Sequence, residues 1–159
     1  MPDAVTIDAM VESDVSAALE IDLVSFAASE IGAGREDPRV VRERSLREEL
    51  VRPWGRLRAA RDQAGTLVGY TLFWHVVDEL HLLNIAVAIS ARRGGIGRAL
   101  MHDLLAYARS HDIARILLEA RAGNAPALAL YEEFGFTRYA VRALYYADCE
   151  DAVEMSLVL

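Results

Sequence analysis

Residues 82–105 read LLNIAVAISARRGGIGRALMHDLL, and this stretch decides the fold. Its first part, Leu82–Val87, is almost wholly apolar, which is typical of a strand buried on both faces. Its last part carries Ile96, Leu100 and Leu104, at spacings that put them on one face of a helix. We therefore expect a strand, then a glycine-rich turn, then a helix.

The turn itself, Arg92–Arg98, reads RRGGIGR and lies where the helix begins. A helix N-terminus carries partial positive charge and unpaired N–H donors, so it readily binds anions. Glycines allow the backbone to approach a bulky phosphate without a Cβ clash, and the arginines add full charge. The turn therefore predicts a phosphate site.

Two nucleotide-binding motifs are excluded at this turn. No Gly-Lys-Ser/Thr follows it, and the chain contains no lysine, so a Walker-type loop is ruled out. The dinucleotide pattern Gly-x-Gly-x-x-Gly is also absent, because residue 100 is Leu.

Composition indicates a folded, soluble domain. The chain has 159 residues, of which 53% are hydrophobic and 26% charged, so residues 1–159 suit one domain with a single core. The net charge of −7 argues against direct nucleic-acid binding. No apolar run reaches membrane-spanning length and no signal peptide is evident, so we expect no membrane association and a cytoplasmic location. Cys149, the single cysteine, and four scattered histidines predict neither a disulfide nor a metal site.

Strands and helices alternate along the chain, which predicts an α/β (α+β) fold around one mixed sheet. The expected strands are Ala4–Met10, Arg56–Arg61, Leu67–Val77, Leu82–Val87, Arg115–Ala120, Phe136–Leu144 and Ala152–Val158, the last with one buried face. Helices are expected after the caps Ser13, Asp37 and Asn124, and from Ile96; Gly135 ends the helix over 125–134.

Three polar side chains near the expected sheet edge are candidates for chemistry. Glu119 ends a strand at the edge where ligands of open α/β sheets gather; its alternative is a solvated Glu paired with Arg121. Tyr131 lies on the next helix, and its alternative is a core aromatic. Asn124 is by default an N-cap.

The motifs closely resemble one enzyme family. Residues 92–97 look like the Arg/Gln-x-x-Gly-x-Gly/Ala signature of the GNAT acetyltransferases, in which the loop holds the pyrophosphate of acetyl-CoA. LEARAGN at 118–124, ALYEEFGF at 129–136 and LNIAV at 83–87 resemble the ribosomal-protein-alanine N-acetyltransferases, within the N-terminal acetyltransferase branch. Tyr145-Tyr146 and the following EDA at 150–152 resemble the ending of that branch.

This resemblance implies a GNAT fold, with a mostly antiparallel sheet of about seven strands flanked by about four helices. It implies Glu119 as general base and Tyr131 as general acid, with acetyl-CoA as cosubstrate and no metal. It assigns the cofactor contacts to Ile85, Ala86, Val87, Arg92, Arg93, Gly94, Gly95, Ile96, Gly97, Arg98 and Asn124. It assigns the acceptor contacts to Phe26, Tyr145 and Tyr146.

The implied activity is acetyl transfer to a protein N-terminal α-amine, with a ribosomal protein as the expected acceptor and a monomer or weak homodimer as the expected state. Near Phe26 the family has Pro-Trp where this chain has Ala27-Ala28, so a small amine such as a polyamine or an antibiotic stays open as acceptor. A non-catalytic acetyl-CoA sensor is the alternative from another class.

Overall fold

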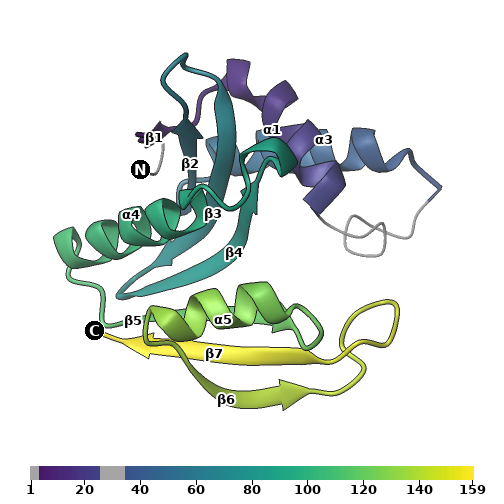
Figure 1. The fold of residues 1–159 in the computed structure, drawn as a ribbon. Coiled ribbons are helices and arrows are strands. Elements are labelled where there is room, and N and C mark those ends of the chain that lie inside the picture. The colour runs from purple at the N-terminus through teal and green to yellow at the C-terminus, as the bar shows by residue number, and fades with distance from the viewer. Residues whose placement is uncertain (1–3, 26–34) are drawn as a thin grey trace.

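One mixed sheet carries the structure. The computed structural model describes residues 4–25 and 35–159 (Figure 1). Within this part of the chain, seven strands lie in the order β1-β2-β3-β4-β5-β7-β6. Neighbours β4 and β5 are parallel, and the other neighbouring pairs are antiparallel. The strands are β1 (Thr6–Ala9), β2 (Gly55–Arg61), β3 (Leu67–Val76), β4 (Glu79–Val87), β5 (Arg115–Arg121), β6 (Thr137–Arg142) and β7 (Ala152–Val158). The predicted mixed, mostly antiparallel sheet is confirmed.

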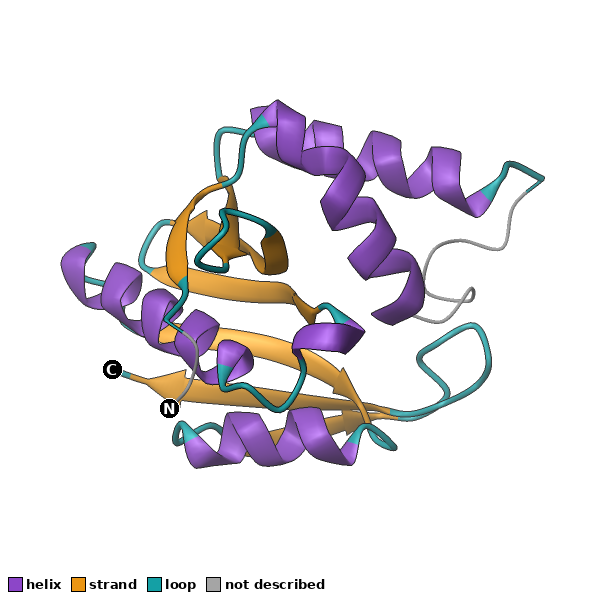
Figure 2. Cartoon of the chain, turned by 45° about the horizontal axis from the view of Figure 1, so that its top comes forward, coloured by secondary structure: helices purple, strands orange, loops and turns teal. Residues whose placement is uncertain are grey.

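Helices cover both faces of this sheet (Figures 1 and 2). On one face, α4 and α5 bury apolar side chains against β4, β5 and β7. On the other face, α1 and α3 pack against β2 and β3. The helical elements are α1 (Val15–Ser25), α3 (Pro38–Val51), α4 (Ile96–Ser110) and α5 (Ala125–Glu133), with short 3-10 turns η1 (Glu12–Asp14) and η2 (Ile89–Ala91). The four α-helices of the described residues agree with the predicted number.

Local signals correctly placed several helix ends. Asp37 caps α3, because its Oδ1 accepts the Arg39 N–H at 2.8 Å, and Pro38 follows in the first turn. Gly135 follows α5 with φ +91°, the left-handed conformation in which glycine is favoured. On α4, Ile96, Leu100 and Leu104 are buried as their spacing predicts.

The prediction that Ser13 caps the first helix is wrong. Ser13 lies inside η1, whose N-cap residue is Val11, and the Asp14 carboxylate reaches back to accept the Val11 N–H at 2.9 Å. Arg61 fixes that carboxylate, since its two terminal nitrogens donate to the two Asp14 oxygens at 2.8 Å each. This hydrogen bonding by Arg61 lowers the pKa of Asp14.

Two predictions of strand burial are also wrong. Leu82–Val87 is not buried on both faces, because Leu83 is 40% exposed. In β7, Ala152–Met155 are all buried, because Val153 and Met155 pack in the core with α4 and α5 and Glu154, on the other face, pairs with Arg142. The acceptor candidate Phe26 lies outside the described residues.

A buried polar cluster joins the helices of one face to the sheet. Asp22 of α1 is fully buried and accepts hydrogen bonds from the Tyr70 hydroxyl of β3 and from the Arg42 guanidinium of α3. Burial raises the pKa of Tyr70, so this phenol stays protonated. The cluster therefore fixes α1 and α3 relative to the centre of the sheet.

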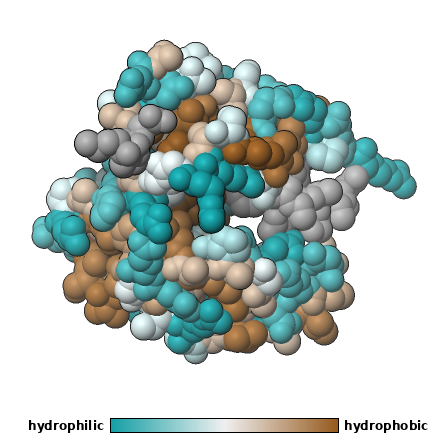
Figure 3. All heavy atoms as spheres, in the orientation of Figure 1, coloured by the Kyte–Doolittle hydropathy of each residue, from teal (hydrophilic) through white to brown (hydrophobic). Residues whose placement is uncertain are grey.

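Apolar residues at the surface are scattered. On the face drawn in Figure 3, hydrophobic side chains reach the surface in several separate places among hydrophilic ones. Such isolated exposure is normal for a folded domain. No helix of the described residues is long and apolar enough to cross a bilayer.

Gly69 marks the tightest approach between β3 and its neighbours. A Cβ at this position would lie 2.9 Å from the Ala86 carbonyl oxygen and 3.3 Å from Ile96 Cγ2. We expect Gly69→Ala to lower the free energy of unfolding by about 1–3 kcal/mol, because β3 would have to move from β4 and α4. Urea unfolding followed by circular dichroism measures this change.

Gly94→Ala is the matched control. Its Cβ would meet only the Ala91 carbonyl oxygen, at 3.4 Å, so its stability should stay close to that of the wild type. Equal stability of the two variants would show that β3 and β4 are not tightly packed at Gly69.

Candidate functional site

The site is organised by the divergence of β4 and β5. Their parallel pairing joins Glu79–Leu82 to Arg115–Leu118 and ends there. On its other side, β4 continues to pair with β3, but Leu83 is an extra residue, since Leu72 opposes Asn84 and Phe73 opposes Leu82. Beyond Leu82, the edge of β4 that faces β5 therefore no longer pairs with β5, and its backbone groups there can bind a ligand.

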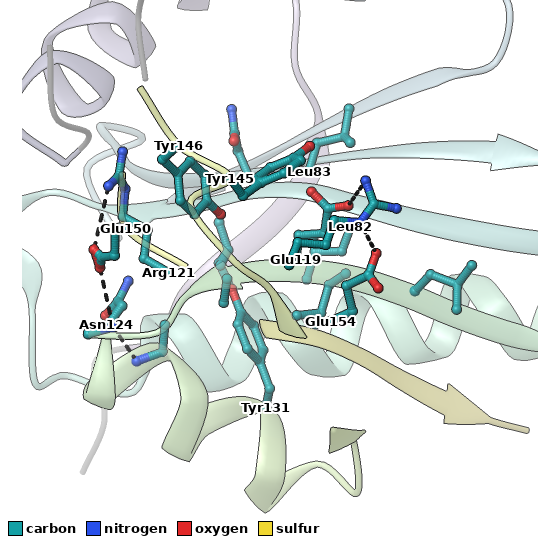
Figure 4. A pocket seen from close by; sticks show the side chains of 18 of the residues that line it. Leu82, Leu83, Glu119, Arg121, Asn124, Tyr131, Tyr145, Tyr146, Glu150 and Glu154 are labelled. Carbon is teal, nitrogen blue, oxygen red and sulfur yellow. Dashed lines mark hydrogen bonds and ion pairs between the residues drawn. The ribbon is translucent and has the colours of Figure 1, made fainter. Parts of the chain in front are cut away.

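A cavity of about 1140 Å³ lies where the two strands part. Its lining contains six of the predicted site residues: Ile85, Glu119, Asn124, Tyr131, Tyr145 and Tyr146. They come from β4, β5, α5 and the loop between β6 and β7, and Figure 4 shows the labelled ones gathered around one space. These segments are distant in sequence, so the fold brings Glu119 and Tyr131 together with two of the acceptor candidates, Tyr145 and Tyr146.

The glycine-rich turn lies outside this lining. Among the described residues, the cavity wall does not extend to the predicted contacts Ala86, Val87 and 92–98. The turn leads into α4 through Gly95, whose φ of +81° is left-handed, and through Arg93, with φ +66°. The predicted cofactor contacts therefore fall into three groups: Ile85 and Asn124 at the cavity, Ala86 and Val87 at the end of β4, and residues 92–98 at the turn into α4.

The arginines of the turn differ in their partners. Arg92 donates from Nε to the Val87 carbonyl oxygen at 3.2 Å, which links the turn to the end of β4. Arg98 makes two hydrogen bonds to Glu133 of α5, at 2.7 and 3.1 Å. Arg98 is thus engaged with another helix, although its side chain is 59% exposed.

Glu119 lies on the face of β5 away from α4 and α5. Its side chain is 35% exposed, and its Oε1 lies 3.7 Å from Arg142 Nη1. The Tyr145 hydroxyl also interacts with it, and hydrogen bonding to the Glu119 carboxylate raises the pKa of Tyr145. Glu119 therefore combines solvent access with two side-chain neighbours at the cavity.

Tyr131 reaches the same cavity from α5 on the opposite face (Figure 4). The residue is only 7% exposed, and burial raises the pKa of its phenol to about 12, with Tyr146 adding to the effect. The phenol is therefore fully protonated at neutral pH. A buried hydroxyl in this state can donate a proton or a hydrogen bond into the cavity.

Asn124 is the N-cap of α5, as predicted. Its Oδ1 accepts the Ala127 N–H at 3.3 Å, and Pro126 lies in the first turn. The Asn124 side chain also lines the cavity, so the residue that caps α5 lies where the predicted cofactor contact would be made.

Arg121 anchors the loop that carries Tyr145 and Tyr146. Its Nη1 donates to both carboxylate oxygens of Asp148 at 2.9 and 2.8 Å and lies 3.5 Å from Glu150 Oε2. Its guanidinium also stacks 4.1 Å above the ring of Tyr146. The side chain is only 13% exposed, so these contacts hold the loop against the end of β5.

Sequence reasoning did not assign the other lining residues to the site, and Arg42, Leu83, Arg121, Arg142 and Glu154 are among them. Arg121 was considered only as a partner of Glu119. Glu154 gave one usable signal, since it is the one charged residue in the strand 152–158. Nothing local to Arg142 or Arg42 marks either as a site residue, because α3, β6 and β5 meet only in the fold.

The described residues offer no metal centre. Outside 1–3 and 26–34, no group of three or more His, Cys, Asp or Glu side chains is arranged to hold an ion.

Comparisons with known proteins agree with this architecture. Residues 21–136 match the model of the acetyltransferase (GNAT) family. The chain is 40% identical over 98 residues to the [ribosomal protein bS18]-alanine N-acetyltransferase of Escherichia coli K12, covering 60% of this chain and 66% of that protein. It is 32% identical over 124 residues to an N-alpha-acetyltransferase of Sulfolobus acidocaldarius, covering 70% of this chain and 74% of that protein.

A solved structure resembles the whole described fold. The crystal structure of the ribosomal-protein-S18-alanine N-acetyltransferase from Escherichia coli superposes with a TM-score of 0.78 at 29% identity, covering 98% of this chain and 94% of that one. One assignment agrees with the seven-stranded sheet, with the divergence of β4 and β5 and with the family match over most of the chain. The chain belongs to the acetyltransferase (GNAT) family.

Proposed function

We propose that this protein transfers the acetyl group of acetyl-CoA to the N-terminal α-amine of a protein, with a ribosomal protein as the expected acceptor. One observation carries the proposal: Glu119 and Tyr131 reach one cavity from opposite faces of the sheet, where β4 and β5 part. The relatives named as ribosomal-protein-alanine and N-alpha-acetyltransferases support the acceptor class.

The residues present fit acetyl-CoA. The start of α4 offers backbone donors and a glycine turn suited to pyrophosphate, and Gly95 already has the required left-handed φ. Past Leu82, β4 no longer pairs with β5, so backbone groups of Ile85–Val87 on that edge, other than the Val87 carbonyl oxygen that Arg92 binds, are available to an amide-bearing pantetheine chain. Acetyl-CoA would supply an acyl group bound to sulfur through a thioester.

Glu119 acts as general base in this proposal. An N-terminal α-amine has a pKa of about 7.7–8.0, so an appreciable fraction is neutral near pH 7, and a carboxylate can accept the remaining proton as nitrogen attacks. A lysine amine, with a pKa of about 10.4, would be much harder to deprotonate with the same base. The cavity therefore suits an α-amine better than a lysine side chain.

Tyr131 acts as general acid. The new bond joins the amine nitrogen to the acyl carbon, and the carbon–sulfur bond breaks. The departing sulfur, with a pKa near the 8.5 of a thiol, takes the proton of the Tyr131 phenol. A backbone N–H near Val87 stabilises the negative charge that develops on the acyl oxygen. Tyr145 and Tyr146 contact the incoming peptide from the loop after β6.

The acceptor class is tested directly. Peptides with free N-termini and varied first residues are compared with polyamines and aminoglycosides, with thiol release and mass spectrometry as readouts. We expect acetylation of peptides at the α-amine. Turnover only with small amines would assign the protein to the small-molecule acetyltransferases, and CoA binding without turnover would make it a sensor.

Glu119→Gln tests the base. We expect kcat to fall by about 10²- to 10⁴-fold, because the amide cannot accept the proton, while CoA affinity stays within about twofold. Steady-state kinetics and calorimetry measure the two quantities. Glu132→Gln is the control, since Glu132 is exposed and pairs with Arg138, and it should keep wild-type kinetics. Loss of CoA affinity in the Glu119 variant would make this residue structural.

Gly97→Asp tests the phosphate loop. A carboxylate in the first turn of α4 repels a pyrophosphate, so CoA affinity should fall by more than about tenfold. An acidic residue at a helix N-terminus stabilises the helix itself, so the loss should come without unfolding. Ala64→Asp, in the exposed turn after β2, is the control for added charge. Unchanged CoA affinity in the Gly97 variant would place the diphosphate elsewhere.

Arg121→Met tests whether the loop bearing Tyr145 and Tyr146 contacts the acceptor. Without the Arg121 side chain, the loop must become ordered when the peptide binds. The entropy cost of this ordering should raise KM for the peptide by about tenfold. Amide exchange of residues 143–151 should also become faster. Arg138→Met, which removes only an exposed ion pair, is the control. An unchanged peptide KM alongside faster exchange would exclude the loop from the acceptor site.

A further inference from the structure

Two carboxylates face each other at the centre of the cavity wall. In the antiparallel pairing of β5 with β7, Glu119 lies directly opposite Glu154. Residues opposite each other in such a pair project from the same face, at close range. Both side chains line the cavity, and Figure 4 shows them close together. Unlike Glu119, Glu154 is buried, with 8% of the residue exposed.

The Arg142 guanidinium contacts both carboxylates, but at different distances. Arg142 of β6 forms an ion pair with Glu154, in which its Nε lies 2.8 Å from Glu154 Oε1. Its Nη1 lies 3.7 Å from Glu119 Oε1, which is beyond hydrogen-bond range. The two dashed lines that meet at one guanidinium in Figure 4 mark these contacts. Arg142 therefore lies closer to the Glu154 carboxylate than to the Glu119 carboxylate.

We propose that Glu154 is a positioning residue that holds the Arg142 guanidinium away from Glu119, so that the Glu119 carboxylate keeps an oxygen open to the amine proton. The inference rests on the proposed function, in which Glu119 is the base. Without Glu154, the nearest carboxylate to Arg142 in the cavity wall is Glu119. A direct pair would occupy the oxygen that accepts the proton and would make the carboxylate a weaker base.

Other charged and titratable groups line the same cavity. Across the described residues these are Arg42, His81, Arg121, Tyr131, Tyr139, Tyr145, Tyr146, Asp148 and Glu150. Of the carboxylates, Asp148 and Glu150 are engaged with Arg121. Glu119 and Glu154 are the pair that contacts Arg142. The pH dependence of catalysis should therefore respond to changes at Glu154 and Arg142 in opposite directions.

Glu154→Met removes the partner of Arg142 while keeping the side-chain volume. We expect kcat at pH 7 to fall by about tenfold and the acid limb of the pH–rate profile to move to lower pH, because a cation then pairs with Glu119. Arg142→Met leaves two facing carboxylates and should move that limb to higher pH. The double variant has neither group and should recover kcat to within about threefold of the wild type.

A purely structural role for Glu154 predicts different results. It would lower stability and kcat without moving the acid limb, and removing Arg142 as well would not restore kcat; either result overturns the proposal. Glu132→Met, which removes an exposed carboxylate that pairs with Arg138 outside the cavity lining, should leave the acid limb in place. If Glu154→Met does not fold, Glu154→Gln keeps the shape and should move the limb in the same direction by a smaller amount.

A crystal structure of the Glu154 variant gives a readout independent of turnover. We expect Arg142 to contact Glu119 directly, at about 2.8–3.0 Å. If the Arg142 guanidinium stays 3.7 Å from the Glu119 carboxylate in this variant, the positioning role is overturned, even if the wild type acetylates peptides. Conversely, absence of peptide acetylation by the wild type refutes the proposed function and leaves this distance as a separate test.

Discussion

The structure depends on the point where β4 and β5 stop pairing. Up to Leu82 and Leu118 the two parallel strands satisfy each other's backbone groups, and beyond that point they separate. A separation inside a sheet is costly, because buried backbone groups lose their partners. Here β3 retains the other edge of β4, and β7 retains the other edge of β5 as far as Arg121. The gap is therefore held open by the strands on either side, and a ligand can complete it.

Charges around the gap are largely matched within the protein. Arg121 pairs with Asp148 and Glu150 of the loop after β6, and Arg142 pairs with Glu154. The chain has a net charge of −7, yet the cavity itself mixes carboxylates with guanidinium groups. Recognition of a cationic amine would therefore depend on Glu119 and its immediate neighbours. The bulk charge of the protein would act only on the rate of encounter, and salt would screen it.

Features set by nearby residues could be predicted from the sequence. The buried face of α4, the cap at Asp37 and the end of α5 at Gly135 each depend on a few adjacent positions. Features set by the pairing of distant strands could not be predicted from the sequence. Leu83 was expected to be buried because its neighbours are apolar, but a bulge turns it toward the cavity.

The same distinction between local and long-range features applies to the residues of the candidate site. Glu119 and Tyr131 belong to continuous motifs, so their sequence context was enough to single them out. Glu154 and Arg142 become neighbours of Glu119 only through the register of β5, β7 and β6. A strand pattern alone assigns Glu154 to a polar face and says nothing of the carboxylate opposite it. The positions of the glycine turn relative to the cavity likewise required the fold.

The cluster of Asp22, Tyr70 and Arg42 has a consequence for how this scaffold can diversify. It locks the facing ends of two helices to a central strand, and Arg42 also forms part of the cavity wall. A substitution at Asp22 or Tyr70 would therefore change the placement of α1, α3 and Arg42 together, so this part of the cavity wall can change only when the whole cluster changes.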